Sequence, residues 1–184
     1  MEPMGNFPVP DREDLPPDVR ERIESETERA GFTPNVFSAM AYRPAQFRAF
    51  FDYHDALVDG ALEREEVEMI VVTVSGVNDC YYCTVAHGAL LRIYADDPLL
   101  ADQLATNHRV ADLGPAHRAM LDFAAKLTES PGRVEREDVE RLREYFPAEA
   151  VWDVAAVVAF YNLSNRMAQV ADLRPNEEFH AMGR

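Results

Sequence analysis

The only two cysteines of this 184-residue chain, Cys80 and Cys83, lie three positions apart, and His87 follows four positions after the second. Because a helix makes one turn in about 3.6 residues, a helix through this segment places all three side chains on one face. Residues three apart on a helix have Cα atoms about 5 Å from each other, a separation that permits a disulfide. The spacing therefore indicates a dithiol that cycles between thiol and disulfide forms beside an imidazole.

The sequence also favours a thiolate at this place. Asn78-Asp79 is typical of a helix cap, and we expect the motif helix to run from Asp79 to about Tyr94. Free N–H groups and the positive dipole end of a helix stabilise a thiolate in its first turn. An imidazole titrates near neutral pH, so His87 can accept or return a thiol proton. The spacing leaves open which sulfur is the nucleophile.

Two other interpretations of the motif have to be weighed. Isolated cysteines are often inert core residues, and a single histidine on a half-apolar helix face is often structural. C-x-x-C with a histidine also occurs in zinc sites, but those normally take further ligands from a second cluster. The remaining histidines are scattered without ligand spacing: His54, His108, His117 and His180. The coincidence of two cysteines and a histidine favours redox chemistry, and we expect no metal.

Composition restricts the class of protein. A net charge of −15 and a pI of about 4.6 argue against nucleic acid or an anionic membrane as partner, because phosphate groups would be repelled. The first 14 residues lack the apolar segment of a signal peptide, and the longest nearly apolar run, Val151 to Tyr161, is too short to cross a bilayer. We therefore expect a cytoplasmic protein, in which C-x-x-C is more often catalytic or metal-binding than a structural disulfide.

The elements that must position the motif are all predicted to be helices. We expect a flexible N-terminal arm (1–14), one all-α domain (15–174), and a polar tail (175–184) that is loose or used in subunit contact. Helical spacing and cap residues predict helices at about 15–30, 36–41, 45–58, 62–77, 79–94, 98–106, 115–128, 135–145 and 147–171. In the last helix, the residues expected to face inward are Trp152, Ala155, Ala156, Ala159, Leu163 and Met167.

The helix before the motif should be deeply buried. Residues 62–77 begin with four glutamates and then become apolar on all sides. Their β-branched residues leave a buried strand as the alternative, but the length and the charged first turns favour a helix. The short connection at residues 76–78 requires this helix and the motif helix to be neighbours in space.

The pattern of Glu68, eleven residues, Cys80-x-x-Cys83, three residues and His87 resembles the alkylhydroperoxidase D/carboxymuconolactone decarboxylase family, in particular its peroxidase-related branch. The likeness extends over about 42–91 and 116–171, including the segment Tyr161-Asn162-x-x-Asn165-Arg166. The resemblance implies an all-α fold, chains that associate as homo-oligomers such as trimers or hexamers, and no haem, flavin or metal cofactor.

The resemblance also implies roles for the site residues. Cys83 would be the thiolate that a peroxide oxidises to sulfenic acid, and Cys80 the proton donor that then closes the disulfide. Glu68 and His87 would be the proton relay. The residues alone do not choose Glu68 over the neighbouring glutamates, although it is the last carboxylate before the apolar run.

One position departs from the best-known pattern of the family. Tyr82 lies where that pattern has a histidine immediately before the second cysteine. A phenol can form hydrogen bonds but is not a base at neutral pH, so Tyr82 is expected to support the site rather than to carry protons. The lipoylated adaptor protein that serves as electron donor in that branch is therefore not assured as the partner here.

We expect a thiol-dependent peroxidase that reduces small alkyl hydroperoxides and is regenerated by a thiol or dithiol, such as a lipoylated or thioredoxin-like protein. Two alternatives remain. The disulfide could be the switch of a redox-sensing or protein-interaction module, or the chain could be a carboxymuconolactone decarboxylase-type lyase. The lyase chemistry does not require paired cysteines, and a shared fold does not decide function.

Overall fold

The structure is a computed structural model that describes residues 3–184, and the regular structure of these residues is helical. Single 3-10 turns lie at Arg12–Asp14, His108–Val110 and Pro131–Arg133. The helices are α1 (Pro17–Ala30), α2 (Asn35–Met40), α3 (Pro44–Val58), α4 (Arg64–Val77), α5 (Tyr81–Ala95), α6 (Leu100–Asn107), α7 (Pro115–Glu129), α8 (Arg136–Arg143), α9 (Ala148–Ala171) and α10 (Glu178–Ala181). The all-α prediction is confirmed, and α10 is a helix that the sequence analysis missed.

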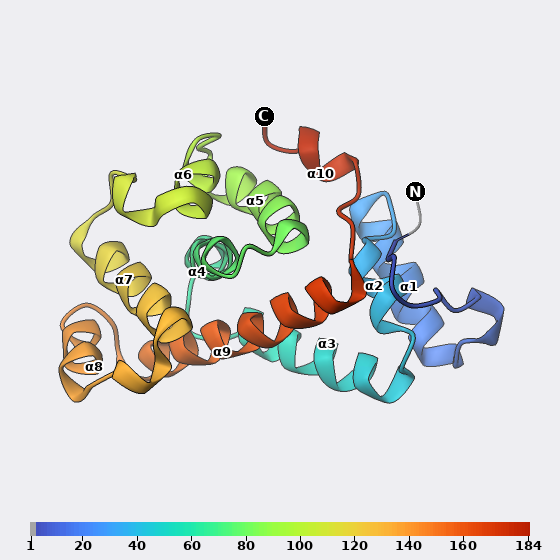
Figure 1. The fold of residues 1–184 in the computed structure, drawn as a ribbon, viewed down its shortest axis with the longest axis horizontal. Helices are drawn as coiled ribbons and strands as arrows, with labels where there is room; N and C mark the ends of the chain where they lie inside the picture. The colour runs from blue at the N-terminus through green and yellow to red at the C-terminus, as the bar shows by residue number, and fades with distance from the viewer. Residues whose placement is uncertain (1–2) are drawn as a thin grey trace.

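Helix α4 is the centre of the core. It is viewed almost end-on in the middle of Figure 1, and it packs against α5, α6, α7 and α9. Every residue from Val67 to Ser75 is buried, which explains why its sequence is apolar on all sides. A capping box between Glu63 and Glu66 fixes its first turn, so the helix prediction is confirmed over the strand alternative.

The connection from α4 to α5 differs from the prediction. Asn78 ends α4, Asp79 adopts a left-handed conformation with φ of 53°, and Cys80 itself is the N-cap of α5. The expectation that Asn78-Asp79 caps a helix beginning at Asp79 is therefore wrong. The chain has to reverse direction within a few residues, and aspartate tolerates the left-handed conformation that this reversal needs.

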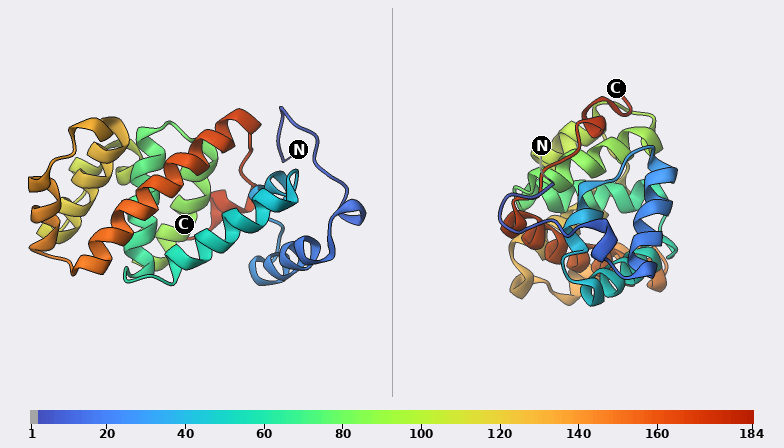
Figure 2. Two further views of the ribbon diagram at one scale, coloured as in Figure 1. Left: turned by 90° about the horizontal axis from the view of Figure 1, so that it is seen from below. Right: turned by 90° about the vertical axis from the view of Figure 1, so that its right-hand side faces the viewer.

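Helix α9 presents a different face to the core from the one predicted. Trp152 is 76% exposed, and Ala159, Leu163 and Met167 are also exposed. Ala155 and Ala156 are partly buried and pack against the core, as predicted. The buried side of the helix carries Val151, Val154, Val157, Val158, Phe160, Tyr161, Ser164, Asn165 and Ala168. Because apolar residues occur all around α9, their spacing does not single out one face. The packing of α9 against α3, α4 and α7 selects the face instead, and Figure 2 shows α3 beside it.

The two ends of the chain pack against the same region. The Gly5 N–H donates to the Ala171 carbonyl at 3.2 Å, and the Arg174 N–H donates to the Pro3 carbonyl at 2.9 Å. The buried Arg92 of α5 donates hydrogen bonds to two carbonyls near the C-terminus, those of Phe179 (3.0 Å) and Met182 (2.9 Å). These contacts hold the C-terminal segment against the motif helix. The flexibility of the arm and the domain boundaries stay predictions.

Candidate active site

The two cysteines meet at the opening of α5. Cys80 is the N-cap and Cys83 lies in the first turn; both are free thiols and are only 1% and 2% exposed. A hydrogen bond from the Cys83 side chain lowers the pKa of Cys80 to about 7, with smaller contributions from the Cys83 backbone N–H and His87. The start of the helix thus stabilises a thiolate at Cys80, as its free N–H groups predict.

Cys83 has the opposite preference. Its hydrogen bond to Cys80 and its burial raise the pKa of Cys83 well above the usual range. Of the two thiols, Cys80 is therefore the one that loses its proton more readily, and Cys83 is the one that keeps it. The resemblance implies a thiolate at Cys83, whereas the resting negative charge of this pair falls on Cys80.

Glu68, which is buried, and His87, which is partly buried, form a pair between α4 and α5. Nδ1 of His87 lies 2.8 Å from Oε2 of Glu68, and the two side chains are 16% and 10% exposed. Glu66, by contrast, accepts from the Glu63 backbone N–H and contacts His117. The structure therefore distinguishes Glu68 from its neighbours, a choice that the sequence alone left open.

Asn165 of α9 is a site residue that sequence reasoning did not single out. It is fully buried, accepts a hydrogen bond from Asn78 at 2.9 Å, and donates to Ser75 at 3.1 Å. Its side chain also hydrogen bonds to both sulfurs, which lowers the pKa of each. The available signal was its place in the segment Tyr161-Asn162-x-x-Asn165-Arg166, to which the sequence analysis assigned no role, and a buried amide has to find partners.

Tyr82 is buried and holds α5 against α2. The Val36 backbone N–H donates to its hydroxyl at 3.2 Å. Burial raises the pKa of Tyr82 above the usual range, so the phenol stays neutral and does not act as a base. Its contacts are those of a supporting residue.

The aromatic cavity, of about 610 Å³, lies on one side of the motif. Cys83 and His87 border it together with Tyr161, whose ring meets His87 edge-on at a centroid distance of 4.9 Å. Its further apolar lining includes Phe37, Phe50, Phe51, Phe160, Phe179 and Met182.

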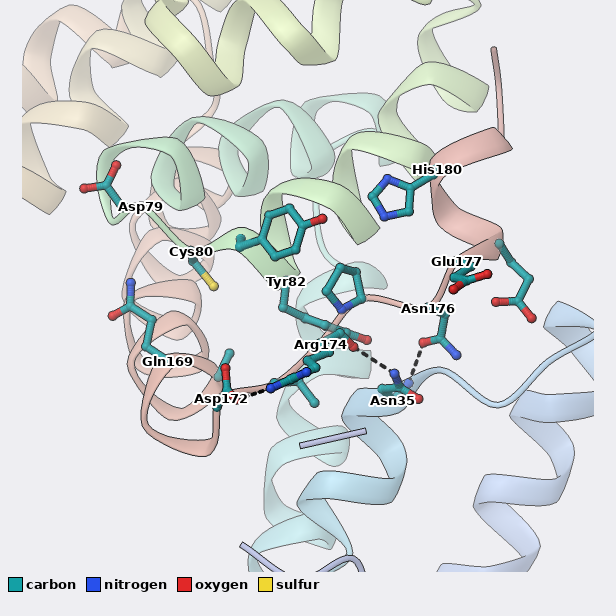
Figure 3. A pocket seen from close by; sticks show the side chains of 15 residues that line it. Asn35, Asp79, Cys80, Tyr82, Gln169, Asp172, Arg174, Asn176, Glu177 and His180 are labelled. Carbon is teal, nitrogen blue, oxygen red and sulfur yellow. Dashed lines mark hydrogen bonds and ion pairs between the residues drawn. The ribbon is translucent and has the colours of Figure 1, made fainter. Parts of the chain in front are cut away.

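The acidic cavity, of about 880 Å³, lies on the other side of the motif and is drawn in Figure 3. Cys80 borders it, and its sulfur points toward the space bounded by Gln169, Asp172 and Arg174 (Figure 3). The charged side chains around this space are Asp79, Asp172, Arg174, Glu177, Glu178 and His180.

Comparison with known proteins places the chain in a family. A sequence model of the carboxymuconolactone decarboxylase family matches residues 44–126. A structure described as an alkylhydroperoxidase AhpD core, an uncharacterized peroxidase-related protein from Ralstonia eutropha JMP134, is 53% identical, with coverage of 100% of this chain and 98% of that chain and a TM-score of 0.96. The chain belongs to the AhpD-like carboxymuconolactone decarboxylase family.

Two further structures are similar to this AhpD-like chain. An uncharacterized peroxidase-related protein from Silicibacter sp. TM1040 is 39% identical, with coverage of 100% of this chain and 97% of that chain and a TM-score of 0.93. The debrominase Bmp8, solved with 2,3,4-tribromopyrrole, is 22% identical, with 97% coverage of both chains and a TM-score of 0.80, and shares the fold. No curated protein matches the sequence significantly.

The other histidines of the AhpD-like chain lie outside the motif. His54 contacts Asp55 at 3.1 Å and packs among aromatic rings, as expected for a structural residue, and burial lowers its pKa. His108 contacts Asp122 at 2.9 Å. Within residues 3–184, no group of three or more His, Cys, Asp or Glu side chains is placed to hold a metal ion. The same residues contain no helix of the length and apolarity that crossing a membrane requires.

Proposed function

We propose that this protein reduces alkyl hydroperoxides through a dithiol–disulfide cycle of Cys80 and Cys83. One observation carries the proposal: two hydrogen-bonded thiols with opposed pKa shifts lie beside a buried Glu–His pair and an aromatic cavity. Perturbed titratable groups that converge on a cavity are typical of catalytic sites. The family membership and the names of the peroxidase-related relatives support the same class of reaction.

The first step oxidises Cys83. Its proton moves to Cys80 along the hydrogen bond between them, and the Cys83 thiolate attacks the terminal oxygen of the hydroperoxide. The O–O bond breaks, and the alkoxide takes a proton from the protonated His87 imidazole and leaves as an alcohol. The sulfur loses two electrons and becomes sulfenic acid. Glu68 holds His87 through their hydrogen bond and stabilises its positive charge.

The second step closes the disulfide. Cys80 attacks the Cys83 sulfenic acid, and the hydroxyl group leaves with the Cys80 proton as water. An external thiol or dithiol then supplies two electrons and two protons, which restore both cysteines and His87. A neighbouring thiol that captures sulfenic acid protects it from further oxidation.

The lining of the aromatic cavity supports an alkyl rather than an inorganic peroxide. Phe50, Phe160 and Tyr161 present apolar surface to the cavity that Cys83 borders. Burial of an alkyl group against such surface contributes about 25 cal/mol per Å² of apolar area, a gain that hydrogen peroxide cannot obtain.

A redox switch is the second candidate. The observation in its favour is that both sulfurs are almost completely buried, which slows any reaction with an external reductant. A switch would be oxidised once per chain and then stop, whereas an enzyme would consume many equivalents of peroxide. The lyase alternative makes no use of the paired thiols.

The test measures the consumption of cumene hydroperoxide, in the presence of excess dithiothreitol, by the parent protein and by the variants Cys80→Ser and Cys83→Ser. We expect turnover only by the parent. In a separate arm, Cys80→Ser that has been reduced and then freed of dithiothreitol should react with one equivalent of peroxide and accumulate a sulfenic acid on Cys83, which dimedone traps for mass spectrometry. Cys83→Ser should not be oxidised at a comparable rate. Absence of turnover by the parent with any small peroxide and dithiol would favour the switch, and dimedone on Cys80 of the Cys83→Ser variant would reverse the two roles.

A further inference from the structure

The two sulfurs border different cavities. Cys83 borders the aromatic cavity and Cys80 borders the acidic cavity, and among the described residues Tyr82 is the one that borders both. Its hydroxyl is held by the Val36 backbone N–H, so its ring is a fixed partition between the two spaces. A molecule that reaches one sulfur therefore does not have to pass the other.

The C-terminal segment completes this partition. Phe179 and Met182 border the aromatic cavity, whereas Glu177 and His180 border the acidic cavity. Arg92 fixes the segment through the carbonyls of Phe179 and Met182. The same short segment, 177–182, thus presents an apolar wall to the cavity of Cys83 and a charged wall to that of Cys80.

The charged side chains around Cys80 are mainly negative. Four carboxylates border the acidic cavity, and the one arginine there, Arg174, is already paired with Asp172 at 2.9 Å. This leaves the carboxylates of Asp79, Glu177 and Glu178, with His180 as the remaining basic group of the described lining. A negatively charged ligand would be repelled at this entrance.

We propose that the reductant reaches Cys80 through the acidic cavity, and that these carboxylates select a neutral or cationic thiol over an anionic one. The inference rests on the proposed function, because it assigns the electron donor of that cycle. The reductant thiolate attacks the Cys80 sulfur, the Cys80–Cys83 bond breaks, and Cys83 leaves and takes up the proton that the reductant released. The second thiol of the reductant gives its proton to His87, attacks the reductant's own sulfur in the mixed disulfide, and releases the Cys80 thiolate.

The access of Cys80 to the acidic cavity sets the site of the first exchange, and the pKa order of the two sulfurs favours the second exchange. A thiol with a low pKa is the better leaving group in thiol–disulfide exchange. Because Cys80 is the sulfur whose thiolate the protein stabilises, the mixed disulfide on Cys80 resolves readily. The aromatic cavity on the peroxide side has no such excess of negative charge, because three arginines (Arg22, Arg29 and Arg64) and three carboxylates (Glu26, Asp55 and Asp59) line it together with the aromatic rings.

The experiment measures disulfide exchange without peroxide. Reduced Cys83→Ser, in which Cys80 is the only thiol, reacts at low ionic strength with three small disulfides: cystamine (cationic), 2-hydroxyethyl disulfide (neutral) and 3,3′-dithiodipropionate (anionic). Mass spectrometry follows the mixed disulfide. We expect cystamine to react faster than the anionic probe by about tenfold, and added salt to reduce the ratio.

Cys80→Ser, in which Cys83 is the only thiol, is the matched comparison. The net charge of −15 acts on both cysteines, so the ratio of rates for the two probes within each variant isolates the local effect. We expect a ratio at Cys83 closer to one. The pair of changes Glu177→Gln and Glu178→Gln, made in Cys83→Ser, should reduce the ratio at Cys80. Changes at the mouth of the aromatic cavity, Glu26→Gln and Asp59→Asn, should leave it unaltered.

Equal rates with all three probes at Cys80, or the same ratio at both cysteines, would overturn the inference. A ratio that survives removal of Glu177 and Glu178 but falls with Glu26 and Asp59 would also overturn it. The proposed function fails separately, because a parent protein without hydroperoxide turnover would leave these exchange ratios measurable.

Discussion

Oε2 of Glu68 lies 2.8 Å from Nδ1 of His87 across the interface between α4 and α5. The contact joins the most deeply buried helix of the core to the helix that carries both sulfurs. Because a buried carboxylate needs a partner, each of the two side chains constrains the other, and the imidazole is held in one orientation beside Cys83.

Removal of the Glu68 charge should slow peroxide reduction. Glu68→Gln keeps a hydrogen-bonding group beside His87 but no longer stabilises its protonated form, so we expect the rate with cumene hydroperoxide to fall about tenfold or more. Steady-state kinetics with excess dithiothreitol measures the loss. Glu65→Gln, in the first turn of the same helix, is the control and should retain the parental rate. Equal rates for all three proteins would contradict a role for Glu68.

Cys80 should react as a thiolate at a pH below that of an ordinary cysteine. With its pKa at about 7, alkylation of Cys80 by iodoacetamide should rise through a midpoint near that pH. Cys83→Ala removes the hydrogen bond that is the main cause, so the midpoint should move upward. Peptide mapping after timed alkylation gives both curves, and coincident midpoints would refute the hydrogen-bonded pair.

The same shift makes the stability of the reduced protein depend on pH. The pKa of Cys80 is lowered in the folded state, so its contribution is present at high pH and is lost as the pH falls through about 7. Between the folded and the unfolded pKa, the free energy of unfolding should therefore rise with pH more steeply in the parent than in Cys80→Ala. Urea unfolding under reducing conditions provides the comparison, and parallel slopes would count against the shift.

Two glycines should respond to alanine in opposite directions. A Cβ at Gly76 of α4 would collide with the backbone carbonyl of Ala105, whereas one at Gly88 of α5 would meet neighbours no nearer than 3.6 Å. Gly88→Ala should stabilise the protein by up to about 1 kcal/mol because alanine is the better helix former. Gly76→Ala should destabilise it, since α4 and α6 would have to separate. Thermal unfolding of both variants tests the pair.

The predicted homo-oligomer has a candidate surface on α9. Trp152, Leu163, Met167 and Val170 are exposed along this helix, and an exposed apolar stripe of this kind is typical of an interaction surface. If the chain forms trimers or hexamers through it, the double change Leu163→Glu and Met167→Glu should reduce the mass measured by light scattering. Tyr145→Glu, at an exposed position after α8, is the control. An unchanged mass would assign the contacts to another face.

The sequence predicted those features that local residue patterns determine. The nine predicted helices are present because caps such as Gly31 and initiating prolines such as Pro44 and Pro115 act within one turn. The predicted inward face of α9 was wrong except at Ala155 and Ala156, because packing against three other helices decides which side is buried. The partners of Asn165 were likewise out of reach, since Ser75 lies 90 positions away along the chain.

In the candidate site, too, features set by local spacing could be predicted, whereas features set by long-range packing could not. The proximity of Cys80 and Cys83 could be predicted from their spacing, but the choice of Glu68 over Glu66 needed the packing of α4 against α5. The helix cap was misplaced at Asn78-Asp79 because the reversal at Asp79 has no signal stronger than an aspartate.

Arg92 holds the C-terminal segment by main-chain oxygens, which every amino acid supplies. The anchor is therefore indifferent to the side chains at positions 179 and 182, although these two side chains shape the space beside Cys83. Substitutions at these two positions can thus change substrate preference, in descendants of this chain or under directed evolution. The contact between Arg92 and the C-terminal segment would stay intact.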